Sequence, residues 1–326
     1  MSVPPLLSKL HLPVIGAPLF IISNPKLVIA QCTAGIVGSF PALNARPASQ
    51  LDEWLHEISE ALAQHDQDNP DTPAAPFAVN QIVHRTNDRF EADMAVCEKW
   101  KVPIVITSLG ARAELNVAVH AWGGITFHDV IDDRFARKAF EKGADGLIAV
   151  AAGAGGHAGC WSPFALVQEI RAWFDGPLVL SGAIATGGAV MAAQAIGADF
   201  AYIGSPFIAT PEANCSEDYR KAIVESGAAD IVNSDLFTGI PGNYLRSSIV
   251  RSGLDPDALG GKAVIPTVTE FGSAGSSKTK AWRDIWGSGQ GIGAIHKAQP
   301  TADYIAQLGR EYEEARARVA ALSPDR

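Results

Sequence analysis

The sequence predicts an α/β protein: a (β/α)8 TIM barrel with a small lid or substrate domain inserted after the eighth strand. Three observations support this fold class. Eight short apolar runs alternate with amphipathic stretches of three or four helical turns. No hairpin turns separate the runs, which is typical of a parallel sheet covered by helices. The GxGxxG fingerprint that an open doubly wound sheet would carry after its first strand is missing.

The expected elements follow one another regularly along the chain. Strands are expected at residues 13–18, 36–40, 77–81, 103–107, 124–128, 146–150, 177–182 and 200–205. Helices are expected at residues 24–33, 51–64, 88–100, 111–121, 132–142, 162–174 and 187–196. Asn24-Pro25 and Ser162-Pro163 each place an N-cap residue before a helix-initiating proline. Eight βα units in about 210 residues have the size of one barrel.

The pattern weakens after the eighth strand. Residues 211–280 have little periodicity, one expected helix at 216–226, and breaks rich in Gly, Pro and Ser. We interpret this segment as a lid over the open end of the barrel, with a loose surface insertion as the alternative. Residues 301–321 predict a charged amphipathic helix on the outside of the barrel. The expected division is a barrel of residues 1–210 and 281–326 and a lid of residues 211–280.

Composition narrows the class of partner. The 326 residues carry 26 Lys and Arg against 35 Asp and Glu, a net charge of −9, which argues against nucleic acid and anionic lipid. Four dispersed cysteines without a CxxC pair suggest a reducing compartment. No basic leader and no apolar stretch of about 20 residues is present, so we expect a cytoplasmic protein that does not enter the membrane. No metal-ligand spacing and no GxSxG elbow is found.

Two turns of small residues follow the seventh and eighth expected strands. They read SGAIATGG at residues 181–188 and GSPF at residues 204–207, and each precedes a helix. Bare backbone N–H groups and a helix N-terminus can hold an anion, and TIM barrels commonly bind phosphate at these two strands. The alternative is that the glycines only allow tight loops. The sequence therefore favours a phosphate site.

Three polar side chains stand at or after strand ends, where barrels place their chemistry. His157 lies among glycines in AAGAGGHAG and has no local side chain to pack against. It is the only side chain of its loop that can move a proton near neutral pH, so we expect it to be catalytic rather than structural. Asn80 is expected to bind a ligand, with a loop-anchoring role as the alternative. His128 is a weaker candidate for ligand or phosphate contact.

Together, six motifs resemble the nitronate monooxygenase family, formerly the 2-nitropropane dioxygenases, which are FMN-dependent (β/α)8 enzymes. The motifs are PVIGAPLF, PFAVNQ, GAGGHAG, SGAIATGG, YIGSPF and DIWGSGQGIGAI, and they span most of the chain. The resemblance implies that His157 is the catalytic base and that FMN lies across the top of the barrel. It implies cofactor contacts from Ala17, Pro18, Asn80, Gly155, Gly156, Gly182, Ala183, Tyr202, Ile203, Gly204 and Ser205. It further implies oxidation of alkyl nitronates, and of nitroalkanes after proton removal, with O2 to a carbonyl compound and nitrite.

The chain departs from the family pattern at three places. Ala183 stands where the family usually has a second Gly, Val150 where it often has Gln, and Gly153 where it often has Glu. Loss of the Gln removes one partner for the flavin ring. Two other functions are kept as alternatives. Related flavin barrels reduce quinones or enoyl thioesters with NAD(P)H, so the first is an NAD(P)H-dependent flavin oxidoreductase, and the second is a flavin-free phosphate-binding barrel. The sequence fixes no oligomeric state for any of the three.

Overall fold

The computed structural model describes residues 3–259 and 284–322. Eight parallel strands lie in the order β1-β9-β8-β6-β5-β4-β3-β2. A parallel bridge between Ile15 and Val37 joins β1 to β2, the two ends of this order, so that the sheet curves into a barrel. The predicted TIM barrel is confirmed. Residues 260–280 of the expected lid and residues 281–283 of the expected barrel lie outside the described residues.

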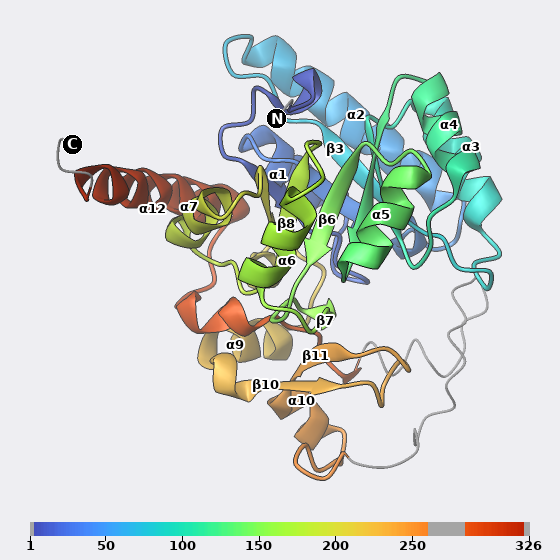
Figure 1. Ribbon diagram of the computed structural model, residues 1–326. Coiled ribbons are helices and arrows are strands. Elements are labelled where there is room, and N and C mark those ends of the chain that lie inside the picture. Colours follow the sequence, from blue (N-terminus) through green and yellow to red (C-terminus); the bar gives the residue numbers. More distant parts are fainter. Residues whose placement is uncertain (1–2, 260–283, 323–326) are drawn as a thin grey trace.

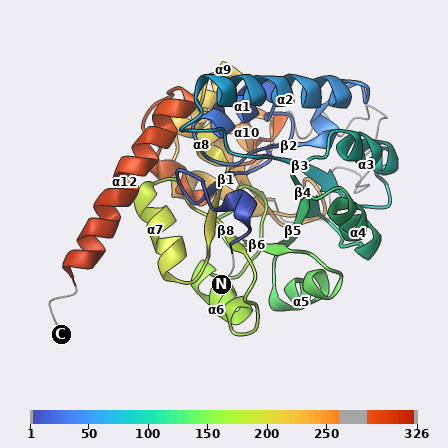
Figure 2. The same ribbon diagram turned by 90° about the horizontal axis from the view of Figure 1, so that it is seen from above.

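Each barrel strand falls on one of the eight apolar runs. The strands are β1 (Val14–Gly16), β2 (Gly38–Pro41), β3 (Phe77–Ile82), β4 (Ile104–Ser108), β5 (Ile125–Val130), β6 (Gly146–Val150), β8 (Leu178–Ser181) and β9 (Phe200–Ile203). The helices between them are α1 (Pro25–Thr33), α2 (Gln50–Asp68), α3 (Phe90–Lys99), α4 (Ala113–Ala121), α5 (Asp133–Glu141), α6 (Pro163–Arg171) and α7 (Gly187–Ala195). Figure 2 shows these helices around the strands.

The two predicted helix starts behave differently. The Asn24 side chain accepts a hydrogen bond from the Leu27 N–H at 3.1 Å and caps α1 as expected. Ser162 precedes α6, but its side chain makes no capping hydrogen bond. The predicted N-cap position of Ser162 before Pro163 is confirmed, and the fixed backbone of Pro163 favours the start of α6 without a side-chain cap.

A second, antiparallel sheet lies beyond one end of the barrel (Figure 1). Its order is β10 (Ile231–Ser234), β11 (Gly242–Leu245) and β7 (Gly156–His157). Since β7 belongs to the loop after β6, this sheet joins the histidine loop to the segment that follows the barrel. Among the described residues after β9, the α-helices are α8 (Ser205–Ile208), α9 (Glu217–Glu225), α10 (Arg246–Arg251) and α12 (Thr301–Ala321), and α9 confirms the helix expected at 216–226. Short 3-10 helices complete the fold: η1 (Pro5–Leu7), η2 (Ala42–Asn44), η3 (Ala228–Asp230) and η4 (Gln290–Ala294).

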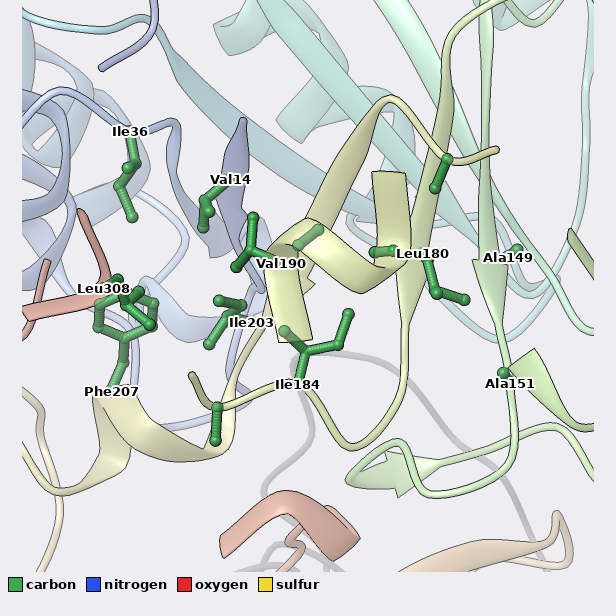
Figure 3. Packing of buried hydrophobic residues seen from close by; sticks show 14 of the residues in the cluster. Val14, Ile36, Ala149, Ala151, Leu180, Ile184, Val190, Ile203, Phe207 and Leu308 are labelled. Carbon is green, nitrogen blue, oxygen red and sulfur yellow. The ribbon is translucent and has the colours of Figure 1, made fainter. Parts of the chain in front are cut away.

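Apolar side chains fill both the inside of the barrel and the layer between its strands and helices. Inside the barrel, Ile15, Ile104, Phe127 and Ile148 belong to one buried cluster. A larger cluster packs β1, β6, β8 and β9 against the surrounding helices (Figure 3). Leu308 of α12 is fully buried in this second cluster, which confirms that residues 301–321 pack on the outside of the barrel. In the part of the chain that the structure describes, no helix is long and apolar enough to cross a membrane.

Candidate active site

The carboxyl ends of the barrel strands open into a cavity of about 1280 Å³. This volume exceeds the roughly 300–1000 Å³ of ordinary small-molecule sites, so the cavity has room for a cofactor and a substrate together. Asn80, Asp129 and Tyr202 line it from strands β3, β5 and β9. His157 of β7 and Trp286, which follows the gap in the described chain, line it from the side of the small sheet. A ligand in this cavity therefore lies between the strand ends of the barrel and the side chains beside the small sheet.

Nearly all of the predicted site residues meet at this cavity. Those that line it are Ala17, Pro18, Asn80, Gly155, Gly156, His157, Gly182, Ala183, Tyr202, Gly204 and Ser205. Ile203 is placed elsewhere: its side chain is fully buried in the core between the strands and the helices (Figure 3). Successive residues of a strand point to opposite faces, so Tyr202 can reach the cavity only if Ile203 points away from it.

His157 is held by partners from the segment after the barrel. Its backbone pairs with Gly242 of β11, and its Nε2 lies 3.2 Å from Thr238 Oγ1. Burial lowers the pKa of His157 from 6.5 to about 4, so the imidazole is neutral at physiological pH. The sequence showed no local packing partner because these partners lie about eighty residues further along the chain.

The two small-residue turns line the cavity, but only part of the expected phosphate geometry is present. Residues 182–185 and 204–206 border the cavity. The N-terminus of α7, in contrast, faces α12: the Gly187 N–H donates to Glu311 Oε2 at 2.8 Å. One N–H at this helix N-terminus is therefore already bonded to a carboxylate of the protein, and the phosphate site at the two turns stays a prediction.

Strained backbone concentrates around the cavity. Ile21, Leu109 and Ala183 have φ angles of 69°, 63° and 56°, in the left-handed region, and all three line the cavity. Each such residue costs about 1–2 kcal/mol relative to glycine. Strain of this kind persists where the surrounding structure requires it, and it clusters at ligand sites. The strained backbone positions therefore mark the same cavity that the predicted site side chains line.

The sequence analysis missed a polar chain on the barrel wall. Asn80 Nδ2 donates to Ser108 Oγ at 2.8 Å, and Ser108 Oγ donates to Asp129 Oδ2 at 2.5 Å. Burial raises the pKa of Asp129 to about 6, although the bond from Ser108 lowers it. A signal was available: Ile106 and Phe127 face the barrel interior, and Ser108 and Asp129 follow them by two residues and so share that face.

His128 is placed on the other face of β5 from Asp129. It is buried, and its Nδ1 lies 2.5 Å from Thr107 Oγ1. Burial and, to a lesser extent, Lys142 lower the pKa of His128 to about 4. The residue borders the cavity, but its hydrogen bond is made within the protein.

Comparison with known proteins agrees with this geometry. The sequence profile of the nitronate monooxygenase family matches residues 5–311. The nitronate monooxygenase of Paraburkholderia phytofirmans is 27% identical over 359 residues and covers 93% of each chain. That of Neurospora crassa is 26% identical, covering 92% of this chain and 89% of the relative. The structure of nitroalkane oxidase from Streptomyces ansochromogenes has a TM-score of 0.79 at 22% identity, covers 96% and 99% of the two chains, and supports the fold. The chain belongs to the nitronate monooxygenase family and is an oxidoreductase.

Proposed function

We propose that this protein is an FMN-dependent enzyme that converts alkyl nitronates, and nitroalkanes after deprotonation, to carbonyl compounds and nitrite with O2. The observation that carries the proposal is the neutral His157, placed by β7 at a cavity large enough for cofactor and substrate. A neutral imidazole can accept the proton next to a nitro group, and a substrate supplied as the nitronate does not need that step.

Thr238 helps to orient the imidazole ring of His157. The Thr238 hydroxyl donates to the Ile240 carbonyl at 3.0 Å and accepts from the Ile240 N–H at 3.3 Å, which fixes its position. His157 Nε2 lies 3.2 Å from this oxygen. The ring of the proposed base is therefore positioned before a substrate arrives.

The residues at the cavity fit FMN in size and in chemistry. Bare backbone at Gly182–Ala183 and Gly204–Ser205 would hold the phosphate, and Asn80 and Tyr202 border the space left for the ring. When bound, FMN supplies the electron acceptance that a nitronate oxidation requires. The protein provides placement and a proton acceptor, and the dispersed free thiols of the described residues are consistent with a cytoplasmic location.

The apolar part of the cavity would exclude water from the reaction. Ile240, Pro241 and Trp286 line the cavity from the side of the small sheet, and Leu19 and Phe20 line it from the loop after β1. A substrate enclosed by these side chains would leave most of its hydration shell, so its proton would pass to His157 rather than to bulk water.

Oxygen consumption and nitrite release test the proposal together. The purified protein is loaded with FMN and given a series of nitronates and nitroalkanes, including the nitronate of 3-nitropropionate. We expect oxygen uptake with nitrite released as substrate is consumed. A flavin-loaded protein that releases no nitrite but is bleached quickly by NADH or NADPH without oxygen would favour the oxidoreductase alternative. A colourless protein that cannot be reconstituted with FMN would favour the flavin-free barrel.

A further inference from the structure

Two polar atoms on the barrel side of the cavity are buried without a partner. Asp129 Oδ1 and Tyr202 OH are shielded from solvent, and neither has a hydrogen bond among residues 3–259 and 284–322. Both residues line the cavity, from β5 and β9 respectively. A buried polar group without a partner costs about 1–3 kcal/mol, so this pair indicates a ligand that supplies the missing hydrogen bonds.

The orientation of the Asp129 carboxyl is fixed by its neighbours. Its other oxygen, Oδ2, accepts from Ser108 Oγ at 2.5 Å, and Ser108 is in turn held by Asn80 at 2.8 Å. Asn80 also donates to the Ile106 carbonyl at 3.2 Å, which fixes this row of hydrogen-bonded side chains to the backbone of β4. Because three strands take part in this chain, the carboxyl is positioned before any ligand arrives. Preorganisation of this kind is typical of binding groups rather than of solvated carboxylates.

Asp129 and Tyr202 act on each other electrostatically although they come from strands that are not neighbours. Burial and, next, the Asp129 carboxylate raise the pKa of Tyr202 well above 10. Tyr202 therefore keeps its proton and can donate it in a hydrogen bond, while Asp129 accepts hydrogen bonds when ionised. Two strands, β6 and β8, lie between β5 and β9. Val150 at the end of β6 is apolar, and Ser181 at the end of β8 also lines the cavity. Asp129 and Tyr202 thus add an acceptor and a donor that a planar heterocycle with both kinds of group can use.

We propose that Asp129 and Tyr202 bind the flavin ring from the barrel side and that the Asp129 carboxylate lowers the reduction potential of the bound flavin. The inference rests on the proposed binding of FMN. A negative charge beside the ring disfavours the arrival of electrons, and its effect is strong in a site that excludes water. His157 lines the cavity from the small sheet. The proposed flavin-binding side chains and the proposed proton acceptor therefore belong to different walls of the cavity.

The test is the midpoint potential of the FMN-loaded protein at pH 8, where Asp129 is ionised. Asp129→Asn keeps the shape and removes the charge, so we expect a higher potential and a shifted absorption band of the bound flavin. Asp132→Asn is the matched control. Asp132 borders the same cavity, and its side chain caps α5 by accepting from the Phe135 N–H at 2.8 Å, a role that Asn also fills. This control should keep the potential of the unmodified protein.

A second variant tests the donor. Tyr202→Phe removes only the hydroxyl, and we expect FMN to bind about tenfold more weakly, the equivalent of one lost hydrogen bond. Unchanged potential and spectrum in Asp129→Asn, or an equal rise in both Asp variants, would overturn the inference. Unchanged FMN affinity in Tyr202→Phe would remove Tyr202 from it. A protein that binds no FMN would contradict the proposed function itself, and this inference with it.

Discussion

The backbone of Gly153 packs directly against the methyl group of Ala183. A Cβ atom added at Gly153 would lie 3.2 Å from Ala183 Cβ and 3.0 Å from Gln290 Oε1. The two residues are also joined by a hydrogen bond of 3.2 Å from the Ala183 N–H to the Gly153 carbonyl. Both are positions at which the sequence analysis expects a departure from the family pattern. Since one departure occupies the space that a side chain at the other would need, we infer that the two are coupled.

This contact predicts that the effects of substitutions at the two positions are not additive. Ala183 has a φ of 56°, so Ala183→Gly should raise the free energy of unfolding by up to about 1 kcal/mol, the relieved strain less the added chain entropy. Gly153→Ala should lower it by more than about 1 kcal/mol, because φ is 87° and the space is short. In the Ala183→Gly background the cost of Gly153→Ala should be smaller. Urea denaturation of the four proteins gives the coupling, and equal costs in both backgrounds would contradict it.

Two adjacent glycines at the start of α7 should differ sharply in their tolerance of alanine. A Cβ at Gly187 would lie 2.1 Å from the Leu308 carbonyl oxygen of α12, whereas a Cβ at Gly188 meets nothing closer than 3.9 Å. Gly187→Ala must push α12 off α7 and should lower the free energy of unfolding by about 3 kcal/mol. Gly188→Ala is the matched control and should be neutral or slightly stabilising. Thermal denaturation compares them, and similar melting temperatures would contradict the packing of α12.

Stability should fall in mild acid because of His128. Its pKa is about 4 in the folded protein and about 6.5 in the unfolded chain, so between these values the unfolded state binds more protons. The contribution of His128 to the free energy of unfolding is therefore fully present above pH 6.5 and is lost as the pH falls toward 4. From pH 7 to pH 5, His128→Asn should lose about 2 kcal/mol less than the unmodified protein. Urea denaturation at both pH values measures this, and equal losses would show that His128 is not buried in its neutral form.

The barrel could be predicted from the sequence because each of its strands is a continuous apolar run between helix signals. The small sheet could not, since β7 has two residues and the partner of His157 on β11, Gly242, lies far along the chain. Strands that pair across so long a stretch of sequence produce no periodic pattern from which the pairing could be predicted. Ser162 takes its predicted N-cap position but makes no capping hydrogen bond: the residue type allows that bond, but the fold decides whether the side chain turns toward the helix.

The site was predictable where its signal is local and not where it depends on distant contacts. His157 and the two turns stand out by composition alone. Asp129 and Ser108 could have been found from the two-residue period of their strands, although not the hydrogen bond between them. Thr238 carries no such signal, because its contact with His157 joins residues that lie 81 positions apart in the sequence.

The comparison of two substrates with His157→Asn tests the central claim most directly. His157 is proposed to remove a proton that a nitroalkane has and a preformed nitronate has lost. In the variant, with FMN content matched by absorbance, kcat/KM for a nitroalkane should fall by about a hundredfold or more, and kcat/KM for its nitronate by less than about tenfold. Equal losses on both substrates would contradict the assignment of His157 as the base.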